Sequence, residues 1–189
     1  MISYDHKIQI SAPRLQKFLS KLEAPLKDYV WIQNRFEETS DPQKDFCFRK
    51  RFNRYYRVRR NSEWQDAFYG LMGECKNKPI NLKYALSELQ KRTSRIEASF
   101  ASKLIATLDP RCPVIDSVVF NNLELQLPKY NSRNRIELTC EVYHILIDTF
   151  ARYLATQSGE YLVSRFRKMY PNVNITETKM LDLVLWQIR

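Results

Sequence analysis

The sequence predicts an all-α protein, a compact multi-helix globule of about nine or ten helices, from three observations. Only three of the 189 residues are glycine, and no Asn-Gly or Asp-Gly pair is present to form a tight hairpin turn. Eight prolines divide the chain into long intervals, as expected where helices start or stop near each proline. Apolar residues recur at a spacing of three or four in nearly every interval. We therefore expect a single all-α domain over 1–189, in which 1–42 can form an N-terminal helical arm.

Helical periodicity and capping residues place each element in order along the chain. The expected helices run approximately over 13–22, 26–38, 43–60, 62–73, 81–91, 96–108, 117–127, 133–155, 158–169 and 178–189. Capping boxes mark three of the starts: Ser62 with Gln65, Ser94 with Glu97, and Asn174 with Glu177. The last of these helices is so apolar that we expect it to close the core against the central helices. Lys179 and Asp182 within it can pair at i, i+3, with a minor effect at the surface.

Composition excludes several classes of protein. The glycine spacing matches neither a dinucleotide-binding loop nor a phosphate-binding loop, so we expect no nucleotide cofactor. The four cysteines are far apart and only two histidines are present, which argues against a metal site and favours buried thiols. No apolar run is long enough for a membrane span, and the first residues lack the pattern of a signal peptide. We therefore expect no membrane partner, no cofactor and a cytoplasmic location.

The segment 44–60 holds much of the net charge of +10. Eight basic residues stand there against Asp45 alone: Lys44, Arg49, Lys50, Arg51, Arg54, Arg57, Arg59 and Arg60. In one interpretation the cations from Arg49 to Arg60 bind nucleic-acid phosphates, while Tyr55 or Tyr56 stacks on an exposed base. In the other, the segment is a solvated basic face whose aromatic residues lie in the core, as we expect for Phe48 and Phe52. The scarcity of local acids favours an anionic partner.

Asp116 and Lys103 are the two candidates for catalysis. Asp116 follows the apolar step 113–115 and precedes an apolar helix, so its carboxylate is expected at a helix N-terminus. It is either an N-cap that contributes about 1 kcal/mol to stability or a fixed catalytic charge. Lys103, if desolvated between apolar turns, can act as a nucleophile. Alternatively, its stem covers the core and its ammonium group stays in water.

The stretch FASKLIATLDP at 100–110, followed by PVIDSVV at 113–119, resembles the corresponding segment of helix-hairpin-helix DNA glycosylases. Over 94–123 this resemblance implies an all-α base-excision fold in which Asp116 stabilises a cationic sugar or activates water during N-glycosidic cleavage. The stretch differs from the family pattern in three respects. The turn at 91–95 has no glycine, Val118 replaces the motif histidine, and Lys103 does not match the family lysine in spacing.

Three functions are consistent with these patterns. The first is a DNA glycosylase-like enzyme in which DNA lies across the basic segment and a flipped base approaches Asp116. The second is a nucleic-acid-binding module without catalysis. The third is an interaction factor whose basic face binds an acidic protein.

Overall fold

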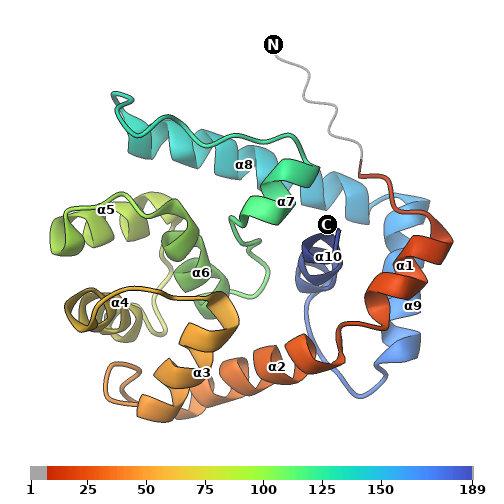
Figure 1. The fold of residues 1–189 in the computed structure, drawn as a ribbon, viewed down its shortest axis with the longest axis horizontal. Helices are drawn as coiled ribbons and strands as arrows, with labels where there is room; N and C mark the ends of the chain where they lie inside the picture. Colours follow the sequence, from red (N-terminus) through yellow and green to blue (C-terminus); the bar gives the residue numbers. More distant parts are fainter. Residues whose placement is uncertain (1–7, 189) are drawn as a thin grey trace. The chain divides into compact units, whose positions relative to one another are not determined.

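Ten α-helices and no β-strand form within residues 8–188, the part of the chain that the computed structural model describes (Figure 1). The helices are α1 (Ala12–Leu19), α2 (Glu23–Glu38), α3 (Phe46–Tyr56), α4 (Ser62–Glu74), α5 (Leu82–Thr93), α6 (Ala98–Leu108), α7 (Ser117–Asn122), α8 (Arg135–Leu154), α9 (Gln157–Met169) and α10 (Glu177–Trp186). The all-α prediction is confirmed. In the same described range, no helix combines the length and the apolar character needed to cross a membrane.

Contacts between residues divide the chain into two units. The middle unit is the continuous segment Glu23–Asp109 and holds α2 to α6. The terminal unit joins residues 8–22 to residues 110–188 and holds α1 together with α7 to α10. Asp116 belongs to the terminal unit, whereas Lys103 and the basic segment belong to the middle unit.

The core of the middle unit is aromatic. Helix α2 packs on α3, α4 on α5, and α5 on α6. Phe48 and Phe52 of α3 are fully buried, as the sequence predicts, because the apolar stripe of this basic helix faces inwards. Their rings contact the ring of Tyr69 at centroid distances of 6.0 and 5.7 Å. Burial of such large rings stabilises the unit and fixes how α3 is rotated about its axis.

The terminal unit is built around its last helix. Helix α10 packs against α1, α7, α8 and α9, and Figure 1 shows it among them. The predicted closing role of this apolar segment is therefore confirmed. Lys179 and Asp182 of α10 pair at 2.6 Å, as expected, but their side chains are only 7% and 9% exposed. The expectation of a surface pair is wrong, because contacts on several sides leave α10 almost no solvent-facing side.

None of the three predicted capping boxes caps its helix at the expected residue. Asn61 rather than Ser62 caps α4, since its side chain accepts from the Trp64 N–H. Thr176 rather than Asn174 caps α10. Ser94 does not start α6 but ends α5, in a left-handed conformation with φ of 57°. The expected burial of the four thiols holds only for Cys75, because Cys47 is exposed and Cys112 and Cys140 are half-buried.

Candidate functional site

Asp116 is the N-cap of α7, as the sequence predicts. Its Oδ1 accepts a hydrogen bond of 2.8 Å from the Val118 N–H, and the side chain is half-buried. The preceding residues Val114 and Ile115 are buried and anchor the chain before the cap. The other carboxylate oxygen, Oδ2, has no hydrogen-bond or ion-pair partner within the described residues. One oxygen therefore holds the group in place while the other remains available to a ligand.

Two side chains from other helices fix the segment that carries Asp116. The Tyr143 hydroxyl of α8 donates to the Pro113 carbonyl at 2.9 Å in a buried position. The Thr176 hydroxyl at the start of α10 donates to the Pro110 carbonyl at 2.6 Å. Because prolines lack an N–H and interrupt regular structure, these carbonyls have to find partners outside a helix. The loop 109–116 is thus attached to two helices of its own unit and holds the carboxylate in one orientation.

Lys103 lies on α6 in the middle unit and is only 8% exposed. Its Nζ donates to the Tyr56 carbonyl at 3.3 Å and lies 4.9 Å from the centre of the Phe100 ring. The Tyr56 carbonyl belongs to the last turn of α3, where backbone carbonyls lack helical partners and the helix dipole is negative. The expectation that the Lys103 ammonium stays in water is therefore wrong. In this position the ammonium group caps the C-terminus of α3.

Carboxylates from other helices of the middle unit pair with most of the predicted basic site. Arg49 pairs with Asp66 at 2.8 Å, and Arg60 with Glu97 at 2.9 Å. Arg54 binds both oxygens of Asp28. Arg51 lies 3.7 Å from the same carboxylate, and its guanidinium group is over the Trp31 ring at 4.2 Å. The shortage of acids within 44–60 is thus balanced by acids that lie far away in the sequence.

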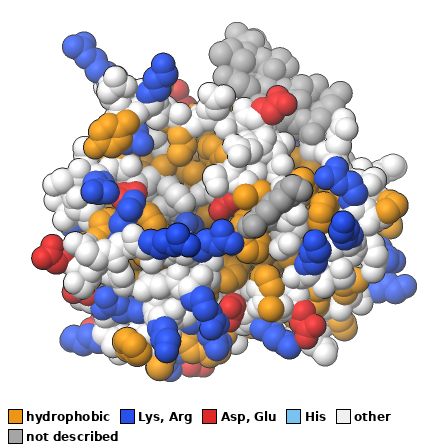
Figure 2. Space-filling model, in the orientation of Figure 1, with side chains coloured by type: hydrophobic (Ala, Val, Ile, Leu, Met, Phe, Trp, Pro, Cys, Tyr) orange, Lys and Arg blue, Asp and Glu red, His pale blue; other side chains and the backbone are white. Residues whose placement is uncertain are grey.

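The remaining cations of the segment are Lys50, Arg57 and Arg59, all of which are exposed. Lys50 and Arg59 have no carboxylate partner among the described residues. Figure 2 shows Lys and Arg side chains spread over the face drawn, with Asp and Glu side chains among many of them. The surface available to an external anion is therefore smaller than the sequence suggests.

The two tyrosines that the sequence offers for base stacking lie in different environments. Tyr56 is buried, and its ring packs 4.6 Å from that of Phe52. Tyr55 is half-buried, at 6.3 Å from the Tyr29 ring and 4.7 Å from the Tyr56 ring. The Tyr55 ring is thus part of the packing between α2 and α3, whereas the Tyr56 ring lies against Phe52 of its own helix and Lys103 of α6.

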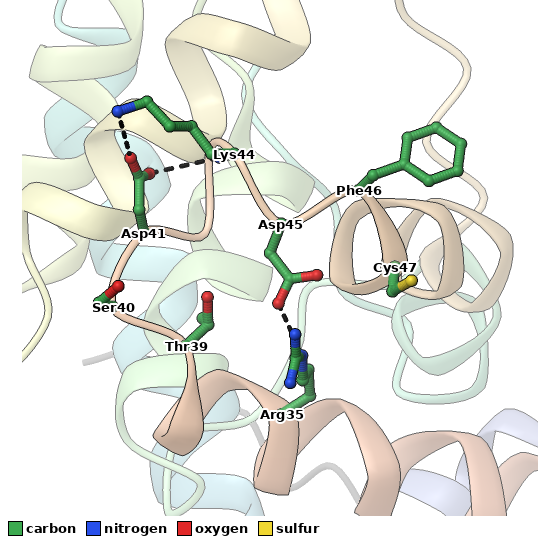
Figure 3. A pocket seen from close by; sticks show the side chains of 8 residues that line it. All are labelled: Arg35, Thr39, Ser40, Asp41, Lys44, Asp45, Phe46 and Cys47. Carbon is green, nitrogen blue, oxygen red and sulfur yellow. Dashed lines mark hydrogen bonds and ion pairs between the residues drawn. The ribbon is translucent and has the colours of Figure 1, made fainter.

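A shallow pocket of about 590 Å³ opens where α2 is connected to α3 (Figure 3). Its lining consists of Arg35, Thr39, Ser40, Asp41, Lys44, Asp45, Phe46 and Cys47. Figure 3 shows that the charged side chains form two internal pairs, Asp45 with Arg35 and Asp41 with Lys44. Burial raises the pKa of the Asp45 carboxyl, but hydrogen bonds from the Phe48 N–H and Arg35 outweigh it, so that the pKa lies below its usual value. The pairs organise the turn and include neither catalytic candidate.

The predicted site residues thus fall into two groups. Lys103, Tyr56 and Arg60 come together in the middle unit, because α6 packs beside the end of α3 and the turn that follows it. Asp116 lies in the terminal unit with its own positioning residues. Sequence reasoning missed Tyr143 and Thr176, which hold its loop, because nothing in a local pattern links them to residues 110–113.

No group of three His, Cys, Asp or Glu side chains able to hold a metal ion occurs within residues 8–188.

Compared with protein-family models, curated proteins and solved structures, the chain matches none. The site is therefore described from its own residues.

Proposed function

We propose that this protein binds DNA and cleaves an N-glycosidic bond with Asp116 as the fixed negative charge. The observation that supports the proposal is the position of this carboxylate. Oδ1 is held by the Val118 N–H, Oδ2 has no partner within the described residues, and the loop that carries the residue is tied to α8 and α10. The resemblance of 100–119 to base-excision glycosylases supplies the reaction class.

The chemistry requires a carboxylate that does not move as the reaction proceeds. When the bond between sugar and base breaks, positive charge develops on the sugar. A preorganised negative charge stabilises that state without reorganisation during the reaction, which is the main source of electrostatic catalysis. The hydrogen bond at Oδ1 fixes the carboxylate and leaves Oδ2 to face the sugar or a water molecule. Lys103 has no catalytic role in this proposal, because its ammonium group caps α3.

The substitution Asp116→Asn tests the proposal, since asparagine caps a helix about as well as aspartate but carries no charge. We expect the variant to keep the wild-type melting temperature and DNA affinity and to lose base release by a factor of 100 or more, on the order expected for a lost electrostatic group. Base release is measured on duplexes that each contain one altered base, by cleavage of the resulting abasic site in alkali. Asp148→Asn, an exposed aspartate of α8, is the matched control. A wild-type protein that releases no base from any duplex would overturn the enzymatic proposal.

The contribution of α3 and of the residues that follow it to DNA affinity is tested separately, with charge-reversal variants. Reversing the two unpaired cations, Lys50→Glu with Arg59→Glu, should weaken binding of duplex DNA and reduce its dependence on salt, because phosphate contacts release counterions. Lys78→Glu, a single reversal at an exposed lysine elsewhere in the same unit, should have little effect. Equal losses in both variants would indicate a non-specific response to net charge.

A nucleic-acid-binding protein without catalysis is the second candidate. It is favoured by the cap itself, because the hydrogen bond to the Val118 N–H gives Asp116 a sufficient structural role. In that case Asp116→Ala lowers stability by about 1 kcal/mol, and no base is released by any variant.

A further inference from the structure

The loop between α7 and α8 has an exposed aromatic ring surrounded by unpaired cations. Tyr130 is 80% exposed, well above the exposure of any other tyrosine in the described residues. The sequence from 127 to 135 is LPKYNSRNR, which contains Lys129, Arg133 and Arg135 and no acid. A single exposed aromatic ring is normal on a protein surface, so the significance of Tyr130 depends on the cations around it.

The cations of this loop differ from those of α3 in their partners. Within residues 8–188, none of Lys129, Arg133 and Arg135 forms an ion pair, although Glu124 and Glu137 flank the loop in the sequence. The Arg135 Nε is buried and has no hydrogen-bond partner there either. On α3 and in the turn that follows it, by contrast, Asp28, Asp66 and Glu97 pair with most of the arginines. The loop therefore presents three positive charges that no carboxylate of the described residues compensates.

The ring itself is arranged as a platform. The Arg135 guanidinium group lies over the Tyr130 ring at 5.0 Å from its centre, so one face is covered and the other faces solvent. A cation on one face of an aromatic ring helps to hold its orientation. The base of the loop is anchored by the buried side chains of Leu123 and Leu125, and the chain turns back at its tip into α8 (Figure 1). The exposed tip is thus carried on a fixed support.

We propose that this loop binds single-stranded nucleic acid, with a base stacked on the open face of Tyr130 and phosphates paired with Lys129 and Arg133. An unpaired base offers its flat face to an aromatic side chain, whereas the bases of a duplex are already stacked on one another. Helix α8 begins without a side-chain cap at Asn134, so its first backbone N–H groups add donors for a phosphate. The choice of nucleic acid as the ligand rests on the function proposed above. The binding loop, the residues that it uses and its preference for single strands go beyond that function.

The test uses the full-length protein and a fluorescent 20-residue oligodeoxythymidine, which has no stable secondary structure. We expect Tyr130→Ala to weaken binding about tenfold, the loss typical of one stacked base, and Tyr130→Phe to stay within about twofold of wild type. Tyr161→Ala, which removes a partly exposed tyrosine of α9, is the matched control and should have no effect. Affinity for a duplex of the same length should change less than twofold in Tyr130→Ala. Since Tyr130 is exposed, all variants should keep the wild-type melting temperature.

The phosphate contacts are tested by salt dependence. For the single strand, log affinity falls linearly with log salt concentration. In the double variant Lys129→Gln with Arg133→Gln, the magnitude of this slope should decrease by about 1.4, the value for two lost phosphate contacts. Arg152→Gln with Lys168→Gln, two exposed cations of the same unit, should leave the slope nearly unchanged.

Three results would overturn the assignment. The first is wild-type affinity of Tyr130→Ala for the single strand, and the second is an equal loss for single strand and duplex. The third is a loss of binding to vesicles containing phosphatidylserine, or to polyglutamate, without any loss for the oligonucleotide. The function proposed above can fail separately, because base release depends on Asp116 and duplex affinity on Lys50 and Arg59. Loss of single-strand binding in Tyr130→Ala would stand even if no variant released a base.

Discussion

The carboxylate of Asp45 joins two helices, because it caps α3 and binds Arg35 of α2 at 2.6 Å. The ion pair with Arg35 requires the ionised form, and the cap is strengthened by it. Since its pKa in the folded protein is lower than usual, this carboxyl contributes stability above about pH 4, the pKa range of an unperturbed aspartate. That contribution is lost as the pH falls through the lowered pKa of the folded state.

We expect Asp45→Asn to unfold about 1 kcal/mol more easily than wild type at pH 7, because it keeps the cap and loses the charge. The difference should shrink as the pH falls from about 4 through the lowered pKa of the folded state, where the wild-type carboxylate becomes protonated. Urea unfolding at pH 7, 5 and 3 measures both effects. Asp41→Asn is the control and should have a smaller effect, since the paired Lys44 side chain is almost fully exposed. A difference that stays constant down to pH 3 would contradict this role for the charge.

Single residues also show which properties the sequence can predict and which it cannot. The cap at Asp116 and the burial of Phe48 and Phe52 are local properties, so spacing and flanking residues predict them. The partners of the basic segment are not local, since Arg54 and Asp28 are 26 residues apart and Arg60 and Glu97 are 37 apart. A count of charges within a segment cannot include such partners. The choice between a desolvated and a solvated Lys103 stayed open for the same reason, because it depends on how α6 packs against the end of α3.

Among the elements, the turn between α5 and α6 contains one of the non-glycine residues with a left-handed backbone conformation. Ser94 ends α5 with φ of 57°, and its N–H bonds to the Gln90 carbonyl at 2.8 Å. A left-handed conformation at this position is usual for glycine and costs other residues about 1 kcal/mol. The sequence predicts a helix start here, because serine followed by glutamate three residues later is also the pattern of a capping box. Serine can occupy either end of a helix, and only its backbone geometry shows whether it begins one helix or ends another.

Replacing Ser94 by glycine should therefore raise the free energy of unfolding by about 0.5–1 kcal/mol, since the relief of the left-handed conformation exceeds the added freedom of the unfolded chain. Ser87→Gly, in the middle of α5, should lower it by about 0.5 kcal/mol, because glycine has a low helix propensity. Chemical denaturation of the two variants provides the comparison. Destabilisation by both substitutions would show that the Ser94 side chain contributes more than its backbone costs.

Helix positions were predicted well and helix boundaries less well. Each predicted helix exists because apolar periodicity decides which face is buried, and that pattern extends over many residues. A boundary depends on one or two side chains, and Asn61 next to Ser62 or Thr176 near Asn174 offers competing caps. For the candidate site, the sequence identified Asp116 but could not supply Tyr143 and Thr176, which hold its loop from distant helices.

At the scale of the whole molecule, the two units should respond differently to loss of α10. A chain that stops before Thr176 loses the helix that contacts α1, α7, α8 and α9, together with the hydroxyl that binds Pro110. We expect amide protection to collapse in residues 8–22 and 110–175 and to persist in α3 to α6. Hydrogen exchange with mass spectrometry resolves the two regions. Uniform loss of protection over the whole chain would instead indicate one cooperative structure.

The discontinuous terminal unit also affects the chain while it is being synthesised. Helix α1 emerges from the ribosome before the other helices described here, yet it packs against α9 and α10, which follow only after the whole middle unit. At about 5–20 residues per second, the wait is on the order of ten seconds. During that time Leu15, Phe18 and Leu19 have no core to enter, although all three are buried in the finished protein. We therefore expect the apolar side of α1 to stay exposed on the nascent chain until α9 and α10 are synthesised.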